Sequence, residues 1–312
     1  MSRAVTAVAV KILVVGSANV DFTVAALRLP SPGETVSEGT LLVNHGGKGA
    51  NQAVAARRLG ADVRFIGCVG RDASGAAIQA ALEGEGIGVE GLVVSATAAT
   101  GTALIVVDPA GQNQITVAPG ANRTLTTDDV EAREADFAWA DIVMCQLEIP
   151  RECVAVALDH ARRHGVITVL NPAPVPAWRL DILPLVDYLT PNAGEAERLS
   201  GVSVHGPSDA IQAAQVLRAA GAGTVVVTLG EEGAVACGEE TVHVPAFTVR
   251  VVDTTGAGDA FNGGFAVALA ERRSLRDALV FASAAAALTC TRRGAQASLP
   301  TRAEVVRLGG SP

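Results

Sequence analysis

Short runs rich in β-branched residues alternate along the chain with segments that carry a helical spacing of apolar residues. Turn residues bound each run, and we predict strands over residues 12–15, 63–69, 141–145, 166–170, 186–189 and 224–229. The intervening segments predict helices over residues 49–59, 74–82, 127–139, 151–164 and 208–220. This alternation is typical of an α/β fold with a doubly wound, mostly parallel sheet flanked by helices. Ligands of such sheets bind at the carboxyl ends of the strands.

Two stretches, residues 22–44 and 100–119, interrupt the alternation because they show strand-like pieces and turns without a helical period. We expect them to pair as a small β-sheet lid that projects over the strand ends. Residues 10–21, 45–99 and 120–308 are accordingly assigned to an α/β domain that binds nucleotide and substrate, and residues 22–44 and 100–119 to the lid.

The composition excludes several classes of protein. With 49% hydrophobic residues, the 312-residue chain can bury the core of one such α/β unit. A net charge of -8 argues against binding to nucleic acid or to an anionic membrane by bulk attraction.

The five cysteines form no CxxC pair and favour a reduced, cytoplasmic protein. No apolar run reaches the roughly 18 residues of a membrane span. Residues 278–290 predict a buried helix, and residues 1–10 a short tail before the first strand.

The strongest local signal is the glycine-rich segment 253–264, which follows a strand-like run at residues 248–252 and begins a helix. Its small residues let backbone N–H groups approach an anion, and the helix N-terminus adds a positive dipole end. Asp259, in the first turn, has two interpretations. It complements the dipole, or it accepts a hydroxyl proton while the N–H groups receive a transferring phosphoryl group.

A second glycine-rich segment, residues 46–52, contains a Gly-Lys pair but is not a P-loop. Leu42 stands where that motif has glycine, and Gly49 follows Lys48 where it has Ser or Thr. One interpretation is that the glycines let a polyhydroxylated ligand approach the backbone, with Lys48 and Asn51 as donors. The alternative is an ordinary glycine-rich helix start with a solvated lysine.

Polar residues also follow several predicted strands. Asn19 and Asp21 lie two positions apart after the first strand, so their side chains point to one side. They either form hydrogen bonds with vicinal hydroxyl groups of a ligand or belong to a turn. Glu148 reaches a ligand or metal-bound water, or it is an exposed loop acid. Asn192 and Glu195 have capping-box spacing, which is compatible with contacts to phosphate and to hydrated magnesium. The turn at residues 228–233 either lies along a nucleotide or is a plain hairpin.

Together these segments resemble the PfkB carbohydrate kinase family over residues 14–300. The family fingerprints correspond to residues 46–51 and 253–259, with further similarity at residues 118–122, 171–174, 191–195 and 294–300. The resemblance implies transfer of the γ-phosphate of MgATP to the 5-hydroxyl of ribose. It also implies activation by potassium and a homodimer formed through the lid.

The same resemblance implies a role for individual residues. Asp259 would be the base, and the N–H groups of Gly256, Ala257 and Gly258 the anion hole. The sugar would be held by Asn19, Asp21, Gly46, Gly47, Lys48, Asn51, Glu148 and Asp259. The nucleotide would contact Asn192, Thr228, Leu229, Gly230, Glu231, Glu232, Gly233, Gly258 and Ser283. Glu195 would order magnesium through water, and potassium would be held by Asp253, Thr255, Thr289, Arg292, Gly294 and Ser298.

Two departures from the family pattern bear on specificity. Ser283 stands where many of these kinases carry His or Asn near the adenine, and His45 replaces the usual proline beside the sugar site. The nearest rival is a kinase of the same family for deoxyribose, fructose or a nucleoside, because single hydroxyl contacts decide the sugar. A dinucleotide-dependent oxidoreductase is disfavoured because no GxGxxG follows Val15. The presence of Asp259 disfavours a non-catalytic sugar-binding module.

Overall fold

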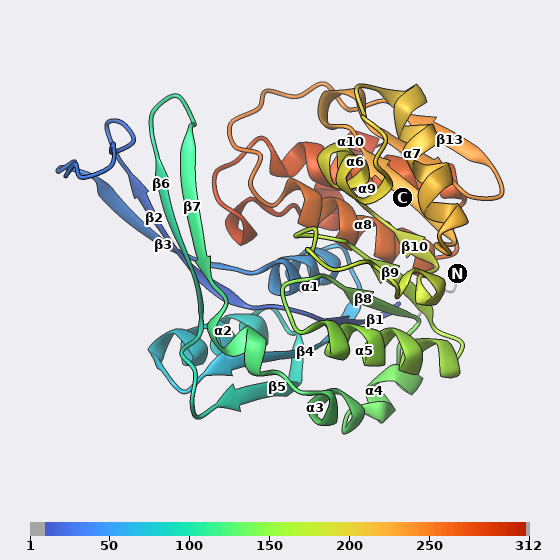
Figure 1. Cartoon of the computed structure of the whole chain (residues 1–312), viewed down its shortest axis with the longest axis horizontal. Coiled ribbons are helices and arrows are strands. Elements are labelled where there is room, and N and C mark those ends of the chain that lie inside the picture. The colour runs from blue at the N-terminus through green and yellow to red at the C-terminus, as the bar shows by residue number, and fades with distance from the viewer. Residues whose placement is uncertain (1–9, 310–312) are drawn as a thin grey trace, which may run out of the picture.

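The computed structural model describes residues 10–309, so the tail predicted at residues 1–10 lies outside the described residues except for Val10. Its main sheet has nine strands (Figure 1). In spatial order they are β13 (Thr241–Val244), β12 (Ala234–Cys237), β11 (Thr224–Thr228), β10 (Tyr188–Leu189), β9 (Ile167–Leu170), β8 (Ile142–Cys145), β1 (Lys11–Val15), β4 (Asp62–Gly70) and β5 (Gly88–Ser95). In this spatial order, the strands from β11 to β5 are all parallel to one another. Strand β12 pairs antiparallel with both β11 and β13. The predicted α/β class is confirmed.

Helices cover both faces of this sheet and bury two separate cores. The first core takes side chains from α1 (Lys48–Arg58), α2 (Ala73–Gly84), α8 (Ala257–Ala270), α9 (Leu275–Thr289) and α10 (Arg302–Gly309). The second takes them from α3 (Thr127–Glu131), α4 (Glu134–Trp139), α5 (Arg151–Arg163), α6 (Ala193–Ser200) and α7 (Pro207–Ala219). Because successive strand residues point to opposite faces, Ile12 and Val14 join the first core while Leu13 and Val15 join the second.

The order of the strands fixes where a ligand can bind. After β1 the chain passes to β4 and β5 on one side, and it then returns to β8 on the other side of β1. The loops that leave the carboxyl ends of β1 and β8 therefore diverge, which predicts a crevice between them. Such a topological switch point is the usual ligand site of doubly wound sheets.

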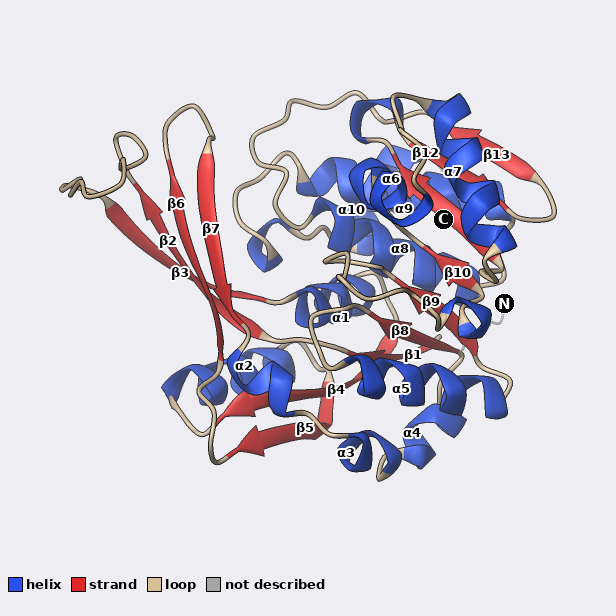
Figure 2. Cartoon of the chain, in the orientation of Figure 1, coloured by secondary structure: helices blue, strands red, loops and turns tan. Residues whose placement is uncertain are grey.

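A second, four-stranded sheet projects from the main body beside this crevice (Figure 2). Its order is β3 (Thr40–Gly46), β2 (Asn19–Ala25), β6 (Gly101–Val107) and β7 (Asn113–Ala118). The two outer pairings are antiparallel, and β2 pairs with β6 in parallel. The two helix-free stretches thus form one sheet, as their patterns predict, and the boundaries of the lid remain a prediction.

Several local predictions were wrong. Residues 248–252 form no strand, because the Val252 N–H bonds instead to the Cys290 carbonyl, at 2.8 Å. The helix predicted over residues 127–139 is broken into α3 and α4, and the strand predicted at 186–189 shortens to β10. Strands β5, β12 and β13 were not predicted.

The five cysteines are free thiols, and all but Cys290 are buried. Within residues 10–309, no helix is long and apolar enough to cross a membrane.

Candidate active site

Asp259 lies in the first turn of α8, where the carboxylate is buried and hydrogen-bonded on both oxygens. Asn51 Nδ2 donates to Oδ2 at 2.9 Å, and Gln52 Nε2 donates to Oδ1 at 3.1 Å. Burial raises the pKa of Asp259, while the charge of Lys48 and the two amide donors oppose that rise. The result is a buried carboxylate with fixed orientation, which is what a general base requires.

Close packing of α1 on α8 brings these groups together. Gly263 lies where the two helices touch, since a Cβ atom there would sit 2.6 Å from Ala55 Cβ and 3.1 Å from the Gln52 carbonyl oxygen. A larger residue would therefore force the helices apart. The glycine keeps Asn51 and Gln52 within hydrogen-bonding distance of Asp259.

Asp21, on β2, contributes a second carboxyl group to the same crevice. Its pKa is raised to about 6 by burial, by the charge of Glu148 and by the charge of Asp259. Gly46, on the neighbouring strand, has no room for a side chain because a Cβ atom would overlap the Asp21 carboxylate. Gly47 has φ +87°, and its Cβ would meet the backbone of Ala18. Packing within the chain thus requires glycine at both positions.

Glu148 follows β8 and is anchored from two sides. Its Oε2 accepts hydrogen bonds from Ser17 Oγ at 2.5 Å and from the Lys48 N–H at 3.0 Å. Burial would lower the pKa of Lys48, but the carboxylates of Asp259, Glu148 and Glu195 outweigh it and raise that pKa. Lys48 is therefore a charged residue among carboxylates, not the solvated lysine of the alternative interpretation.

Asn19 completes the crevice from the base of the lid sheet. The Asn122 amide donates to Asn19 Oδ1 at 2.7 Å and accepts from the Ala18 N–H at 2.9 Å. Asn122 belongs to the segment 118–122 that resembles the kinase family, although no role was predicted for it. Its hydrogen bond to Asn19 Oδ1 fixes the orientation of the Asn19 side-chain amide.

The proposed anion hole lies at the start of α8, where Gly256 has φ +79°. The Ala257 N–H donates within the turn to the Thr254 carbonyl, at 3.2 Å. Around Gly258 there is open space, since a Cβ atom there would meet no atom within 4 Å. The open face at Gly258 gives an anion access to the helix end.

Among the residues predicted to contact nucleotide and magnesium, Asn192 and Glu195 form a capping box at the start of α6. Asn192 Oδ1 accepts from the Glu195 N–H at 2.8 Å, and Glu195 Oε2 accepts from the Asn192 N–H at 2.9 Å. Burial raises the pKa of Glu195. The turn at residues 228–233 joins the antiparallel strands β11 and β12, so it is a hairpin, and Asn192 bridges to Thr228 beside it. Ser283 lies buried in α9.

The residues predicted to hold potassium come from two segments that lie side by side. Asp253 Oδ2 accepts from the Gly294 N–H at 2.9 Å, and Oδ1 accepts from the Thr255 N–H at 2.9 Å. Burial alone would raise the pKa of Asp253, but these hydrogen bonds lower it. The Thr289 carbonyl accepts from the Arg292 N–H, and the Ser298 hydroxyl donates to the Ala295 carbonyl. In the described part of the chain, no group of three or more His, Cys, Asp or Glu residues could hold a metal ion.

His45 lies on β3, where its register partner is Val20 rather than Asp21. Since neighbouring residues of a strand point to opposite faces, His45 is on the face of the lid sheet opposite to Asp21. Its Nδ1 atom is buried and has no hydrogen-bond partner among residues 10–309. A direct contact between His45 and the sugar is therefore not favoured by this geometry.

Sequence reasoning missed a group of polar residues that hydrogen-bond to the predicted site residues or to one another. They are Ser17, Gln52, Gln146, Asn171 and Asn262. A signal was available, because Gln146 and Asn171 each directly follow a predicted strand and Gln52 ends the segment 46–52. Long-range contacts among them were not readable from sequence.

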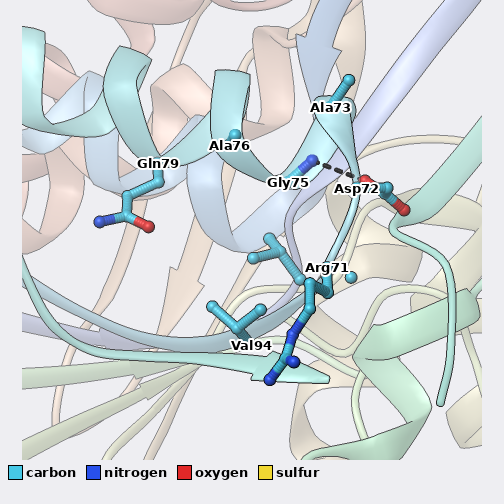
Figure 3. Close-up of a pocket in the computed structure, with 9 residues that line it drawn as sticks. Arg71, Asp72, Ala73, Gly75, Ala76, Gln79 and Val94 are labelled. Atoms are coloured by element: carbon cyan, nitrogen blue, oxygen red, sulfur yellow. Dashed lines mark hydrogen bonds between the residues drawn. The ribbon is translucent and has the colours of Figure 1, made fainter. Parts of the chain in front are cut away.

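A cavity of about 490 Å³ lies elsewhere, between the start of α2 and β5 (Figure 3). Arg71 and Val94 line it, and the Gly75 N–H donates to Asp72 Oδ1 at 2.8 Å. None of the predicted site residues contributes to its lining. This cavity is separate from the candidate active site.

Comparison with known proteins identifies the family of this chain. The family model described as "pfkB family carbohydrate kinase" matches residues 9–302. The chain is 42% identical over 294 residues to a ribokinase of Haemophilus influenzae, covering 94% of this chain and 96% of the relative. It is 35% identical over 293 residues to a deoxyribokinase of Salmonella typhi, covering 93% of this chain and 95% of the relative.

Among solved structures, the ribokinase of Arabidopsis thaliana complexed with ribose and ATP superposes with a TM-score of 0.88. That structure is 34% identical in sequence, and the match covers 98% of this chain and 100% of the other. The similarity in sequence and in structure extends over both the main sheet and the lid. The chain belongs to the pfkB family of carbohydrate kinases.

Proposed function

We propose that this protein is an ATP-dependent kinase that transfers the γ-phosphate of ATP to the 5-hydroxyl of D-ribose, giving D-ribose 5-phosphate. One observation carries the proposal. The buried Asp259 carboxylate lies at the open N-terminal end of α8, in electrostatic contact with Asp21 and Glu148 at the topological switch point. Relatives named ribokinase, about 40% identical over nearly their whole length, support ribose as the acceptor.

Asp259 acts as the general base in this reaction. The ribose 5-oxygen attacks the γ-phosphorus, the new O–P bond forms while the bond to the β-phosphate oxygen breaks, and ADP leaves. The proton of the 5-hydroxyl passes to Asp259. The N–H groups at the start of α8 and the charge of Lys48 stabilise the negative charge on the transferring group.

Asn19, Asp21, Lys48, Asn51 and Glu148 orient the sugar through its hydroxyl groups. Asn51 Oδ1 supports this role, since it is buried without a partner in the described chain and can accept a hydroxyl donor. The turn at residues 228–233 and Asn192 take the nucleotide. Ser283 lines the adenine end.

Two cations belong to the proposal. Glu195 fits an indirect magnesium site, because one of its oxygens caps α6 and the other is left for a metal-bound water. Bound magnesium would neutralise charge on the phosphates. The oxygen-rich junction of Asp253 with residues 289–298 fits a monovalent cation, which would stiffen the backbone of the anion hole.

The decisive experiment measures ADP formation with ribose, deoxyribose, fructose and adenosine as acceptors. We expect ribose to give the highest kcat/KM. Asp259→Asn should retain ATP binding and lower kcat by about 10² to 10⁴, the usual contribution of a positioned base. Turnover of this variant within a few-fold of the wild type would rule out Asp259 as the base.

Deoxyribose is the second candidate acceptor because a deoxyribokinase is among the relatives. The two sugars differ only in the 2-hydroxyl, so a single lost hydrogen bond separates them. Preference for deoxyribose in the same assay would change the proposed acceptor sugar but not the family of the kinase. A nicotinamide-dependent oxidation receives no support from family membership.

We further propose a homodimer formed through the lid. Its strands expose large apolar side chains, at 48–58% of their surface, which a second copy would cover. These are Leu41, Leu42, Val43, Leu104, Ile115 and Val117. The cytoplasmic location suggested by the cysteines remains a prediction from sequence.

A further inference from the structure

Gln52 is fully buried on α1 and forms a hydrogen bond with every polar atom of its side chain. We propose that Gln52 is a positioning residue for the phosphoryl transfer, holding the Asp259 carboxylate in one orientation toward the acceptor hydroxyl. This inference rests on the proposed function only for its kinetic consequences. The contacts themselves come from the structure.

The Asp259 carboxylate sets the direction of the Gln52 amide, because its oxygens only accept hydrogen bonds. Gln52 Nε2 donates one hydrogen to Asp259 Oδ1 and the other to Asn171 Oδ1, both at 3.1 Å. On the opposite side of the amide, Gln52 Oε1 accepts from Gln146 Nε2 at 2.7 Å. A rotated amide would place Oε1 against two acceptors and lose both bonds that Nε2 donates. Gln52 is therefore locked as a donor to Asp259.

Beyond Asn171, the chain of contacts returns to the start of α8. Asn171 Nδ2 donates to the Thr190 carbonyl at 3.0 Å, and the Thr190 hydroxyl donates to Asn262 Oδ1 at 2.5 Å. Asn262 Nδ2 then donates to the Gly258 carbonyl at 2.8 Å. The network thus holds both the side chain of Asp259 and the peptide immediately before it. It fixes the base relative to the N–H groups that would receive the phosphoryl group.

Ionisation of Asp259 depends on the same donors. Burial raises its pKa, and Glu148 acts in the same direction, whereas Lys48, Asn51 and Gln52 lower it. Asp21 is the remaining titratable group in electrostatic contact with Asp259. Removing the Gln52 donor leaves the neutral acid more stable, because an amide N–H favours the carboxylate. A variant without it needs a higher pH to keep its base ionised.

The first test compares Gln52→Met with Gln79→Met in the full-length enzyme. Methionine keeps the length of the side chain and removes its hydrogen bonds, and Gln79 is a half-buried residue of α2 outside the active site. For Gln52→Met we expect kcat to fall roughly tenfold with the KM for ATP little changed. The acid limb of its kcat profile should move up by about one pH unit. Gln79→Met should match the wild type.

A second variant covers the case in which Gln52→Met does not fold. Gln146→Met leaves Gln52 in place but removes the hydrogen bond to its Oε1, so Gln52 is held less firmly and the acid limb should move the same way by a smaller amount. A folded variant at either position with an unmoved acid limb overturns the proposal, because a purely structural role would change stability without changing the pH profile.

A titration without substrate separates this inference from the identity of the acceptor. The ¹³C carboxyl signal of Asp259, assigned by its loss in Asp259→Asn, should titrate at higher pH in Gln52→Met than in the wild type. Absence of ribose-dependent ADP formation by the wild type would count against the proposed function alone. An identical Asp259 titration in both proteins would overturn the role of Gln52.

Discussion

A Cβ atom on Gly46 would lie 2.1 Å from Oδ2 of Asp21, so the carboxylate occupies the space that any side chain at position 46 would need. The two residues lie on adjacent strands of the lid, at the end nearest the main sheet. This contact ties Asp21, which we propose binds the sugar, to the glycine-rich segment that leads into α1.

Gly46→Ala should therefore act on the sugar more than on the nucleotide. Displacing Asp21 is expected to lower kcat/KM for ribose on the order of 10- to 100-fold, as misplacing a substrate-binding group commonly does. The KM for ATP should change little. Gly84→Ala is the control, since no atom lies within 4 Å of a Cβ there and α2 tolerates alanine. Equal kcat/KM for ribose in the two variants would contradict a role for Asp21.

Asp21 also predicts how sugar binding depends on pH. Its pKa of about 6 means that the carboxyl group is partly protonated just below neutral pH. Because the ionised form accepts hydroxyl hydrogens, we expect ribose to bind roughly tenfold more weakly at about pH 5 than at pH 7.5. Calorimetry without nucleotide would measure this. Asp21→Asn should bind weakly at both pH values, and an unchanged wild-type affinity would refute the assignment.

The free energy of unfolding of the ligand-free protein should depend on pH in the opposite direction to ribose binding. Because of Asp21, it should fall as the pH rises. The folded state keeps a proton on Asp21 between about pH 4 and pH 6, where the unfolded chain has released it. This contribution to the free energy of unfolding is present below that window and is lost as pH rises through it. Bound ribose would compensate, because it favours the ionised carboxylate.

The fold was predictable wherever a strand is central and rich in β-branched residues, as in β1, β4, β8 and β11. Edge strand β5 was missed, and it contains Gly88, Gly91 and Glu90, which weaken a strand pattern. The false strand at residues 248–252 has the right residues but no neighbouring strand to pair with. In that segment tertiary context decided the structure.

The motifs identified the residues of the site more readily than their contacts. Gln52 and Asp259 are separated by 207 positions in the sequence, and only the packing of α1 against α8 brings their side chains together. The capping box of Asn192 and Glu195 was predictable because it is local. Asn122 was not, since its partner Asn19 lies 103 positions away.

We predict that the lid sheet moves when ribose binds. If the sheet closes over the sugar, the stretches 22–44 and 100–119 should become protected from hydrogen exchange together when ribose is added. Strand β13, at the edge of the main sheet away from the lid (Figure 1), provides an internal control that should not respond. Two stretches that respond independently, or not at all, would remove support for a closing lid.

The junction of Asp253 with Gly294 predicts a dependence on the monovalent cation. Their hydrogen bond joins the turn before the anion hole to the loop 289–298 across 41 positions of sequence. An ion held by the oxygens there would fix the backbone of the proposed anion hole, so it should raise kcat by preorganisation and leave the KM for ribose nearly unchanged.

Initial rates in sodium, potassium and caesium salts at matched ionic strength would measure this effect. We expect potassium to give rates several-fold above the other two, because general screening affects all three alike whereas a site of defined size does not. In Asp253→Asn the three rates should converge, since the anionic ligand is gone while the hydrogen bond from Gly294 can still form to the amide oxygen. Equal rates for the three salts in the wild type would exclude a selective cation site, and Asp259 would remain the base without it.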